Sequence, residues 1–363
     1  MTGKALFAAG GTGGHMFPAR AAADALIARG WEVRLITDSR GARHAADFPG
    51  GPPTVIEAQS PFQKNPVRLV GALSKLAKGY GQTRAMMKAF QPDVVAGFGG
   101  YPAFPVLAAA RAGKIPFVIH EQNAVLGRVN RLFSGSAAVV ASGFNRLDRA
   151  SDKAKHRVVG NPVRAAVLKA AETPYAAPQP DGEFRLLVIG GSLGARMLSV
   201  TVPRAVAELP DDLRQRLKVV QQTREENLDE ARQLYAEAGV EAELAPFFKD
   251  MGKLYAETLL VVSRAGASSV SEIAAIGRPA IFVPLALAMD DHQSANAENL
   301  VEAGAAEAIS EADFTVQRLR ESLETAMTGG EALKSRADAA RARGRPLAHE
   351  HLADMIAAAA KAP

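Results

Sequence analysis

The sequence contains no cysteine, and this absence excludes structural disulfides and metal sites built from thiolates. It also lacks the ~20 consecutive apolar residues that a membrane-spanning helix requires. The longest apolar segments, such as AIFVPLALAM at 280–289, are predicted to be buried strands. The apolar stretch at the start, MTGKALFAAGG, runs into glycine after a few residues, so we expect no cleaved signal peptide. These absences fit a globular protein of a reducing compartment.

Short apolar runs alternate with longer alanine-rich stretches along the chain. KALFAAG, an alanine-rich segment ending at Gly30, and WEVRLIT indicate a strand, a helix and a strand. Apolar residues make up 48% and charged residues 22% of the chain, which is typical of a soluble globular enzyme. This alternation predicts an α/β fold, with helices on both faces of a parallel sheet. Further strands are predicted within 93–99, 116–121, 137–142, 217–222, 258–264 and 279–285.

The same plan begins again halfway along the chain. FRLLVIGGSLGARMLSVTVPRAVAEL at 184–209 has the pattern of KALFAAGGTGGHMFPARAAADAL, and 363 residues exceed the usual size of one core. GNPVR at 160–164 and the proline-rich segment 173–183 are predicted to form a hinge region. We therefore predict two similar domains facing one another across a cleft, an N-terminal domain at 1–163 and a C-terminal domain at 164–345. The final helix, 346–363, could belong to either.

Three glycine-rich loops follow predicted strands and open predicted helices. They are GGTGGH (10–15), GFGGYP (97–102) and GGSLGA (190–195). A glycine loop that leads into a helix presents free N–H groups and the positive end of the helix dipole, which phosphate oxygens bind. Any one loop could equally be a tight turn without a ligand. Three of them in a doubled architecture favour a phosphate-bearing ligand.

The usual nucleotide fingerprints are missing from these loops. From Gly11 the sequence reads GTGGHM and from Gly190 it reads GGSLGA, so neither satisfies G-x-G-x-x-G. The chain has no G-x-x-x-x-G-K-[ST], which argues against hydrolysis of ATP or GTP. Asp38 after the second strand could still hold a ribose, so a nicotinamide oxidoreductase is disfavoured and not excluded. A pyrophosphate carrier of another kind remains.

Six motifs match a known family in order and spacing. They are GGTGGH, PDVVAGFGGYPAFP (92–105), HEQN (120–123), GNPVR (160–164), GGSLGAR (190–196) and SEIAAIGRPAIFVP (271–284). In this combination nearly the whole chain resembles the MurG family of peptidoglycan glycosyltransferases. That family adds N-acetylglucosamine (GlcNAc) from UDP-GlcNAc to undecaprenyl-pyrophosphoryl-MurNAc-pentapeptide (lipid I), which gives lipid II.

The resemblance implies an α/β fold of the GT-B type, in which two Rossmann-like parallel-sheet domains face a central cleft. The N-terminal domain would hold the lipid acceptor and the C-terminal domain UDP-GlcNAc. The final helix, 346–363, would pack back on the N-terminal domain.

An inverting transferase must deprotonate the attacking hydroxyl, align it behind the anomeric carbon and stabilise the departing UDP. His15 is the candidate base, because it begins a helix on a loop that should face the cleft and an imidazole titrates near pH ~6.5. Alternatively, His15 only hydrogen-bonds the acceptor pyrophosphate or caps the loop. The resemblance places Thr12, Gly13 and Gly14 where donor sugar and acceptor meet, and assigns Gly11, Gly99, Gly100 and Tyr101 to the acceptor diphosphate loops.

Several residues are assigned to the donor by resemblance, and each has a simpler structural interpretation. Asn123 would hydrogen-bond the transferred sugar, or be a buried amide that satisfies a loop. Ser192, with the amides of its loop and the charged Arg164, would stabilise the leaving group, although Arg164 could equally form a hinge salt bridge. Glu272 would accept hydrogen bonds from both ribose hydroxyls, or be a first-turn glutamate at the helix dipole.

The remaining donor positions are assigned by the same resemblance. Phe248 matches the position whose backbone reads uracil, and its side chain is expected in the core; Gln293 would bind the GlcNAc hydroxyls. The helix start that would bind phosphate and ribose comprises Ala267, Ser268, Ser269, Val270 and Ser271. Ser268 and Ser269 could instead act as N-caps.

The chain departs from the family at three places that concern the donor sugar and the acceptor loop. Leu193 and His292 stand where the family commonly has glutamine, and SPFQKNPVR (60–68) differs from the family's glycine-rich basic loop. The resemblance therefore covers the contacts to UDP more fully than the contacts to the donor sugar. The pair Asp290–Asp291 is interpreted as a solvated loop, so we expect no tightly bound metal or cofactor.

Acidic residues are absent between Ala58 and Pro92, where basic and apolar residues interleave. By itself this pattern is typical of an amphipathic helix whose basic side is solvated. An acceptor carried on a lipid favours attachment to an anionic membrane surface, and the net charge of +5 and the pI of 9.4 permit it. The predicted membrane contacts are Lys64, Arg68, Leu73, Lys75, Leu76 and Lys78.

We therefore expect a peripheral protein on the cytoplasmic face of the bacterial inner membrane. Its expected partners are UDP-GlcNAc, lipid I, anionic inner-leaflet lipids and, by family resemblance, proteins of cell division and cell-wall synthesis, with no nucleic acid.

Besides the disfavoured oxidoreductase, three rival functions remain open from the sequence. A UDP-GlcNAc 2-epimerase would share the architecture and turn over UDP-GlcNAc without an acceptor. A related transferase would bind the same donor and use another glycolipid or natural product. A non-catalytic nucleotide-binding protein would have no use for His15 and the acceptor loops.

Overall fold

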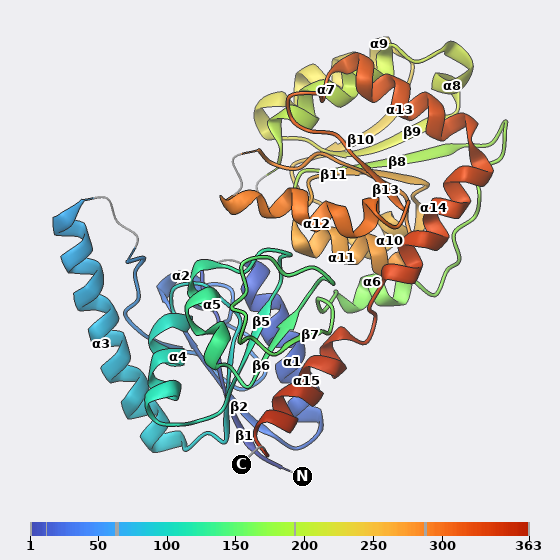
Figure 1. Ribbon diagram of the computed structural model, residues 1–363. Helices are drawn as coiled ribbons and strands as arrows, with labels where there is room; N and C mark the ends of the chain where they lie inside the picture. The colour runs from blue at the N-terminus through green and yellow to red at the C-terminus, as the bar shows by residue number, and fades with distance from the viewer. Residues whose placement is uncertain (1, 12, 62–64, 192–193, 287–288, 362–363) are drawn as a thin grey trace. The chain divides into compact units, whose positions relative to one another are not determined.

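The computed structural model describes residues 2–11, 13–61, 65–191, 194–286 and 289–361. The chain divides into two compact units (Figure 1). Unit 1 comprises Met1–Pro162 with Leu347–Pro363, and unit 2 comprises Val163–Pro346. The boundaries predicted from the sequence, 163/164 and 345/346, each differ from these by one residue.

Unit 1 is built on a seven-stranded parallel sheet with the order β3-β2-β1-β4-β5-β6-β7. Its strands are β1 (Lys4–Ala8), β2 (Glu32–Thr37), β3 (Thr54–Val55), β4 (Val94–Gly97), β5 (Phe117–Glu121), β6 (Val139–Ser142) and β7 (His156–Val158). Both faces of the central strands are buried, as a parallel sheet between helices requires. The chain order reverses between β1 and β4, so the loops that follow these two strands lie side by side.

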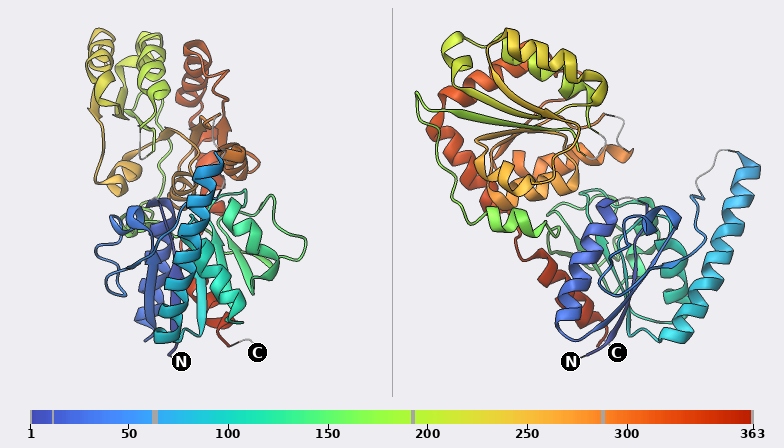
Figure 2. Two further views of the ribbon diagram at one scale, coloured as in Figure 1. Left: turned by 90° about the vertical axis from the view of Figure 1, so that its left-hand side faces the viewer. Right: turned by 180° about the vertical axis from the view of Figure 1, so that it is seen from behind.

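Helices cover both faces of this sheet (Figures 1 and 2). They are α1 (Gly13–Ala28), α2 (Ser39–Ala42), α3 (Pro66–Phe90), α4 (Ala103–Ala112), α5 (Arg128–Phe133), the 3₁₀ turn η1 (Ser134–Ser136) and α15 (Ala348–Ala359). Because successive strand residues point to opposite faces, Ala5 and Phe7 pack with α1 and α15, whereas Leu6 and Ala8 face the cluster of α3, α4 and α5. The last helix of the chain thus packs against α1 in unit 1.

Unit 2 repeats the plan with a six-stranded parallel sheet in the order β10-β9-β8-β11-β12-β13. Its strands are β8 (Phe184–Ile189), β9 (Leu217–Gln222), β10 (Glu241–Ala245), β11 (Leu260–Ser263), β12 (Ala280–Phe282) and β13 (Ala306–Ala308). Its helices are α6 (Ala165–Ala170), α7 (Arg196–Ala207), α8 (Asp211–Gln215), α9 (Leu228–Glu237), α10 (Met251–Glu257), α11 (Ala267–Ile276), α12 (His292–Val301), α13 (Val316–Thr328) and α14 (Gly330–Arg343). The 3₁₀ turns are η2 (Glu225–Asn227) and η3 (Met289–Asp291).

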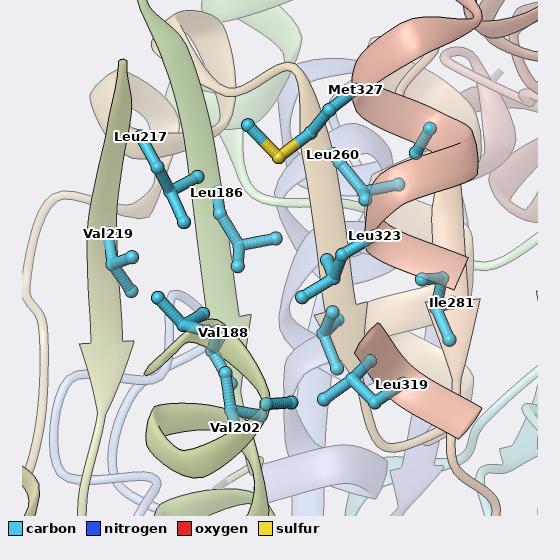
Figure 3. Close-up of a cluster of buried hydrophobic side chains, with 14 of the residues drawn as sticks. Leu186, Val188, Val202, Leu217, Val219, Leu260, Ile281, Leu319, Leu323 and Met327 are labelled. Atoms are coloured by element: carbon cyan, nitrogen blue, oxygen red, sulfur yellow. The ribbon is translucent and has the colours of Figure 1, made fainter. Parts of the chain in front are cut away.

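One face of this second sheet packs against α7 and α13 (Figure 3). Leu186 and Val188 of β8 point toward Val202 of α7 and Leu323 of α13, and all four side chains are buried. The order of this sheet reverses between β8 and β11, so the loops after these strands are neighbours, as they are in unit 1.

The buried strand predicted over 280–289 is shorter than expected. β12 ends at Phe282, and Leu285 is 36% exposed. Pro284 has no N–H to donate to a strand ladder, so it does not continue the sheet. Residues 283–286 instead lie outside any strand, and η3 and α12 follow later in the chain.

Candidate functional site

In unit 1, two glycine loops meet where the strand order reverses. Gly11, Gly99 and Gly100 have φ of 80°, 94° and 77°, which side-chain-bearing residues rarely adopt. A Cβ on Gly100 would lie 2.8 Å from the carbonyl oxygen of Gly10, so the two loops touch backbone to backbone. Ligands of open α/β sheets bind at such a reversal, outside the carboxyl ends of the strands. The positive φ at Gly11, Gly99 and Gly100, and the close approach at Gly99 and Gly100, favour glycine whether or not a ligand is bound.

His15 lies at this reversal, in the first turn of α1. Its Nδ1 is 2.9 Å from the carbonyl oxygen of Gly10. A carbonyl only accepts hydrogen bonds, so Nδ1 carries the proton and Nε2 is the basic nitrogen. The half-buried ring lies against Gly99, where a Cβ would be 3.1 Å from Nε2. Gly13 and Gly14 are exposed beside it, and Thr12 lies outside the described residues.

The HEQN motif follows at the carboxyl end of β5. Glu121 is buried, and its carboxylate accepts hydrogen bonds from Asn123 N and Nδ2, Gly127 N and Asn130 Nδ2, at 2.9–3.3 Å. The Asn123 amide is therefore held with its nitrogen toward Glu121. Sequence reasoning did not single out Glu121 or Asn130. Glu121 stands inside the quoted motif at a strand end, which is the signal that could have identified it.

His120 is a structural member of the same motif. Its Nε2 lies 3.2 Å from the carbonyl oxygen of Gly160, and its Nδ1 lies 3.0 Å from Nε2 of Gln122. Burial lowers the pKa of His120 to about 4. The ring is therefore neutral at physiological pH, with Nε2 as the donor.

Asp38, which the sequence left open as a ribose ligand, has structural partners. Its carboxylate caps α2 by accepting from Gly41 N at 2.8 Å and pairs with Arg40 at 3.0 Å.

In unit 2 the loops after β8 and β11 are the counterparts of the first pair. Gly191 and Gly194 have φ of 82° and 67°, and a Cβ on Gly190 would lie 2.3 Å from the amide nitrogen of Ala195. Ser192 and Leu193 are outside the described residues. Buried Gln222, at the end of β9, accepts from Gly190 N and donates to Gly191 O, each at 3.0 Å. The sequence analysis did not identify these two hydrogen bonds of Gln222, although it predicted LKVVQQ to be a strand.

The loop after β11 leads into α11, whose N-cap is Gly266. Ser268 is exposed, Ala267, Ser269 and Ser271 are half-buried, and Val270 is buried. Glu272 follows in the second turn, so it is not the first-turn glutamate that the sequence left open. It forms a two-pronged pair with Arg164, the N-cap residue of α6, at 2.6 and 2.5 Å.

The charges of this pair differ in their exposure. Glu272 has only 6% of its side chain exposed, whereas Arg164 has 40%. Burial by itself would lower the pKa of Arg164, but hydrogen bonding to Glu272 and its charge outweigh burial and raise it. Burial also raises the pKa of Tyr255 well above its ordinary value, and the neighbouring charge of Glu272 adds to the effect.

A second ion pair contacts residues 283–286, which follow β12. Buried Arg264 donates to Val283 O at 2.9 Å and pairs with Glu311 at 2.5 Å, while the other oxygen of Glu311 accepts from Ala286 N at 3.1 Å. Gln293 in the first turn of α12 accepts from Leu285 N at 3.0 Å. Its carbonyl oxygen is thus engaged, and its NH₂ group is the part able to donate to a ligand.

Two expectations from the sequence are wrong. Phe248 is half-buried in the loop between β10 and α10 and does not belong to the core, and its neighbour Phe247 is 67% exposed. Leu76 is only 5% exposed, because it lies on the stripe of α3 that packs inward, together with Ala72 and Gly79. Leu76 is therefore not a membrane contact.

The other predicted membrane contacts are at the surface of α3. Arg68, Lys75 and Lys78 are exposed, Leu73 is 50% exposed, and Lys64 lies outside the described residues. Two further apolar side chains in the first turns are more exposed still, Val67 at 79% and Val70 at 68%. No helix within the described ranges is long and apolar enough to cross a membrane.

Among the residues that the structure describes, no three His, Asp or Glu side chains form a group that could hold a metal ion.

Comparison with known proteins agrees with both halves of the chain. The glycosyltransferase family 28 N-terminal domain matches residues 5–142, and the C-terminal domain of the same family matches 185–352. A relative from Maricaulis maris, 58% identical over 97% of this chain and 96% of its own, is a UDP-N-acetylglucosamine–N-acetylmuramyl-(pentapeptide) pyrophosphoryl-undecaprenol N-acetylglucosamine transferase.

Two solved structures resemble this chain at different levels of sequence identity. The crystal structure of Acinetobacter baumannii MurG has a TM-score of 0.81 and 32% identity, covering 98% of this chain and 99% of that one. A UDP-GlcNAc 2-epimerase from Neisseria meningitidis, bound to UDP-GlcNAc, has a TM-score of 0.67 at 12% identity over 98% of this chain and 100% of that one, so it shares the fold alone. Both matches extend over the two parallel-sheet units, which agrees with the predicted α/β fold of the GT-B type. The chain belongs to glycosyltransferase family 28, as a hexosyltransferase of the MurG family of peptidoglycan synthesis.

Proposed function

We propose that this chain transfers GlcNAc from UDP-GlcNAc to the 4-hydroxyl of MurNAc in undecaprenyl-pyrophosphoryl-MurNAc-pentapeptide, with inversion at the anomeric carbon, to give lipid II. The observation that carries the proposal is 58% identity over 97% of the chain to a transferase with this donor and acceptor. The glycine loops at both sheet reversals support it, because the donor and the acceptor each carry a diphosphate.

In the proposed reaction His15 is the general base. The 4-hydroxyl oxygen forms a bond to the anomeric carbon, the bond from that carbon to the β-phosphate oxygen breaks, and the hydroxyl proton moves to Nε2 of His15. The Nδ1–H···O bond to Gly10 supports this role, because it leaves Nε2 as the nitrogen that can accept a proton. Asn123, oriented by Glu121, would hydrogen-bond the transferred sugar.

Unit 2 would hold the donor. Backbone N–H groups of the loop after β8, with Ser192, and the start of α11 would bind the diphosphate and stabilise the charge that develops on UDP. Arg164 would add a permanent positive charge. Glu272 would accept the ribose hydroxyls, the backbone at Phe248 would read uracil, and the NH₂ group of Gln293 would donate to a GlcNAc hydroxyl. No tightly bound metal or cofactor is needed in this scheme.

The decisive experiment supplies labelled UDP-GlcNAc with a lipid I analogue and identifies the product. We expect a disaccharide on the lipid and release of UDP, with only slow hydrolysis when the acceptor is omitted. Conversion of UDP-GlcNAc without an acceptor would instead indicate an epimerase, and UDP release only with a different glycolipid would indicate another acceptor. Binding of UDP-GlcNAc with no formation of UDP or of another product in any of these assays would indicate a non-catalytic protein.

Unit 1 would hold the lipid acceptor and lie against the cytoplasmic face of the inner membrane. The support is the start of α3, where Val67, Val70 and Leu73 are exposed beside Arg68 and Lys75. Apolar side chains flanked by basic ones suit an interface with anionic lipid. This attachment would be peripheral. At the membrane the enzyme would interact with proteins of cell-wall synthesis and division.

The attachment is tested by sedimentation with vesicles that contain anionic lipid. Replacing Arg68 and Lys75 by alanine should weaken binding by about 2 kcal/mol at low salt, since each basic residue near such a surface contributes ~1 kcal/mol. The matched control replaces the exposed Arg84 and Lys88, near the other end of α3, and should bind more nearly like the wild type. Sedimentation that does not change between low and high salt contradicts the model.

A further inference from the structure

The pair between Arg164 and Glu272 occupies both oxygens of a carboxylate to which we assign a ligand. Nε of Arg164 donates to one oxygen at 2.6 Å and Nη2 donates to the other at 2.5 Å. The two residues are 108 positions apart, and both belong to unit 2. A bidentate pair of this kind, with two parallel charge-assisted hydrogen bonds, is stronger than a pair of neutral hydrogen bonds.

A ribose diol that approaches Glu272 therefore competes with a guanidinium. The carboxylate is 6% exposed, so water does little to compensate it when Arg164 leaves. The two ribose hydroxyls are neutral, so they compensate the buried carboxylate less well than the guanidinium does. They can replace Arg164 at Glu272 only if the arginine gains another anionic partner. A nucleoside by itself offers no such partner.

A diphosphate does offer one, and Arg164 is placed to reach it. Ser268 lies four residues before Glu272 on the same face of α11, one helical turn of ~5.4 Å nearer the N-terminus, where phosphate oxygens would bind. The Arg164 side chain is 40% exposed and stands at the start of α6, outside the packed core of the unit. A long flexible side chain can cover one turn without movement of the backbone.

We propose that Arg164 is a specificity-determining residue that makes recognition of the ribose conditional on the diphosphate. The diphosphate draws the guanidinium away from Glu272, and the released carboxylate then accepts the 2′- and 3′-hydroxyls. Nucleosides, which cannot displace Arg164, are rejected although they carry the same base and sugar. This inference rests on the proposed function, because it takes UDP-GlcNAc as the donor.

The test measures how much the ribose hydroxyls contribute with and without a diphosphate. Four competitors displace labelled UDP: UDP, 2′,3′-dideoxy-UDP, uridine and 2′,3′-dideoxyuridine. In the wild type, loss of the hydroxyls should weaken the diphosphate pair about tenfold or more, the size expected for hydrogen bonds to a charged group. The nucleoside pair should differ by less than about twofold. Equal ratios for the two pairs overturn the inference.

Removing the arginine should open the carboxylate to nucleosides. In Arg164→Ala, uridine should bind about tenfold more tightly than in the wild type and more tightly than dideoxyuridine, whereas UDP loses its contact to the guanidinium. Uridine that binds this variant no better than the wild type overturns the inference. The control is Arg204→Ala, which removes an exposed arginine paired with Glu230 in the same unit and should leave every ratio unchanged.

The reciprocal variant covers the case in which Arg164→Ala does not fold. In Glu272→Gln the guanidinium is no longer held by a charge, so inorganic pyrophosphate should compete with UDP about tenfold more effectively than in the wild type. Unchanged competition by pyrophosphate overturns the inference. Failure of the proposed function looks different, because wild-type protein would then not bind UDP or not form lipid II at all.

Discussion

At the scale of single residues, hydrogen bonds select the state of two histidines. His15 donates from Nδ1 to Gly10, so its Nε2 is the basic nitrogen. Nε2 of His120 lies 3.2 Å from the carbonyl oxygen of Gly160, and burial of the ring keeps it neutral. The first arrangement suits a proton acceptor, and the second suits a fixed part of the scaffold.

Replacement of His15 by alanine tests its role in catalysis. We expect kcat to fall by about 10²–10⁴, the usual contribution of a general base, with the fold unchanged by circular dichroism. His44→Ala, which removes an exposed histidine of the same unit, is the matched control and should retain wild-type kcat. A loss of less than about tenfold in His15→Ala would remove this residue from the base role.

The buried His120 predicts a pH dependence of stability. Its pKa is about 4 in the folded protein and ~6.5 in the unfolded chain, so below pH ~6.5 the unfolded state binds the additional proton. The free energy of unfolding should therefore fall as the pH drops from ~6.5 toward 4, by up to about 3 kcal/mol at 1.36 kcal/mol per pH unit. Urea unfolding at several pH values measures it, and His120→Gln should flatten this part of the profile. Coincident pH profiles for the two proteins would contradict the assignment.

At the scale of elements, α3 combines an exposed start with an anchored middle. Its first turns expose Val67 and Val70, whereas Leu76 and Gly79 are buried against the rest of unit 1. Gly79 is the point of closest approach, because a Cβ there would lie 2.1 Å from the carbonyl oxygen of Glu57. Glycine in the middle of a helix is thus explained by the backbone that crosses it.

Alanine substitutions along α3 should have opposite effects. Gly79→Ala should destabilise the protein by about 1–3 kcal/mol, because the helix or residue 57 must move to admit the methyl group. Gly81→Ala on the exposed side has no atom within 4 Å of the added Cβ and should stabilise by about 0.5–1 kcal/mol. Chemical denaturation of both variants provides the comparison. Equal effects would mean that α3 does not pack on residue 57 at this point.

At the scale of the whole molecule, the chain forms two cores and then returns to the first. Leu352 and Ile356 of α15 are fully buried among residues of β1, β4 and α1, and Arg29, directly after α1, pairs with Asp354 at 2.6 Å and also with Glu350. The end of the chain is therefore part of unit 1, although unit 2 lies between them in sequence.

Separate cores predict two thermal transitions with different sensitivities. Leu352→Ala should lower the transition of unit 1 through a cavity cost of about 2–5 kcal/mol, and the matched Leu323→Ala should lower that of unit 2. UDP at 100 times its dissociation constant should raise the transition of unit 2 alone, by about 2.7 kcal/mol of stability. Differential scanning calorimetry measures all three. A single transition that shifts equally in every case would contradict independent cores.

Local sequence patterns were sufficient to predict most of the fold. Alternation of apolar runs with alanine-rich segments predicted the two parallel sheets, and glycines after β1, β4 and β8 predicted the loops at their reversals. The short strands β3, β7, β10 and β13 were not predicted, because two to five residues at a sheet edge carry little periodicity. The order of the motifs sufficed for the family.

Only the tertiary structure decided which side chains meet. Arg164 and Glu272 belong to different predicted segments, and no local pattern shows that they pair across 108 residues. The inward position of Leu76 depends on which face of α3 packs against α4 and residue 57, and the hydrogen bonds of Gln222 to the β8 loop depend on strand order. Local sequence fixes backbone conformation through near-neighbour sterics and periodicity. Contacts between side chains that are distant in the sequence depend on how whole helices and strands pack together, and no single segment of the sequence determines that packing.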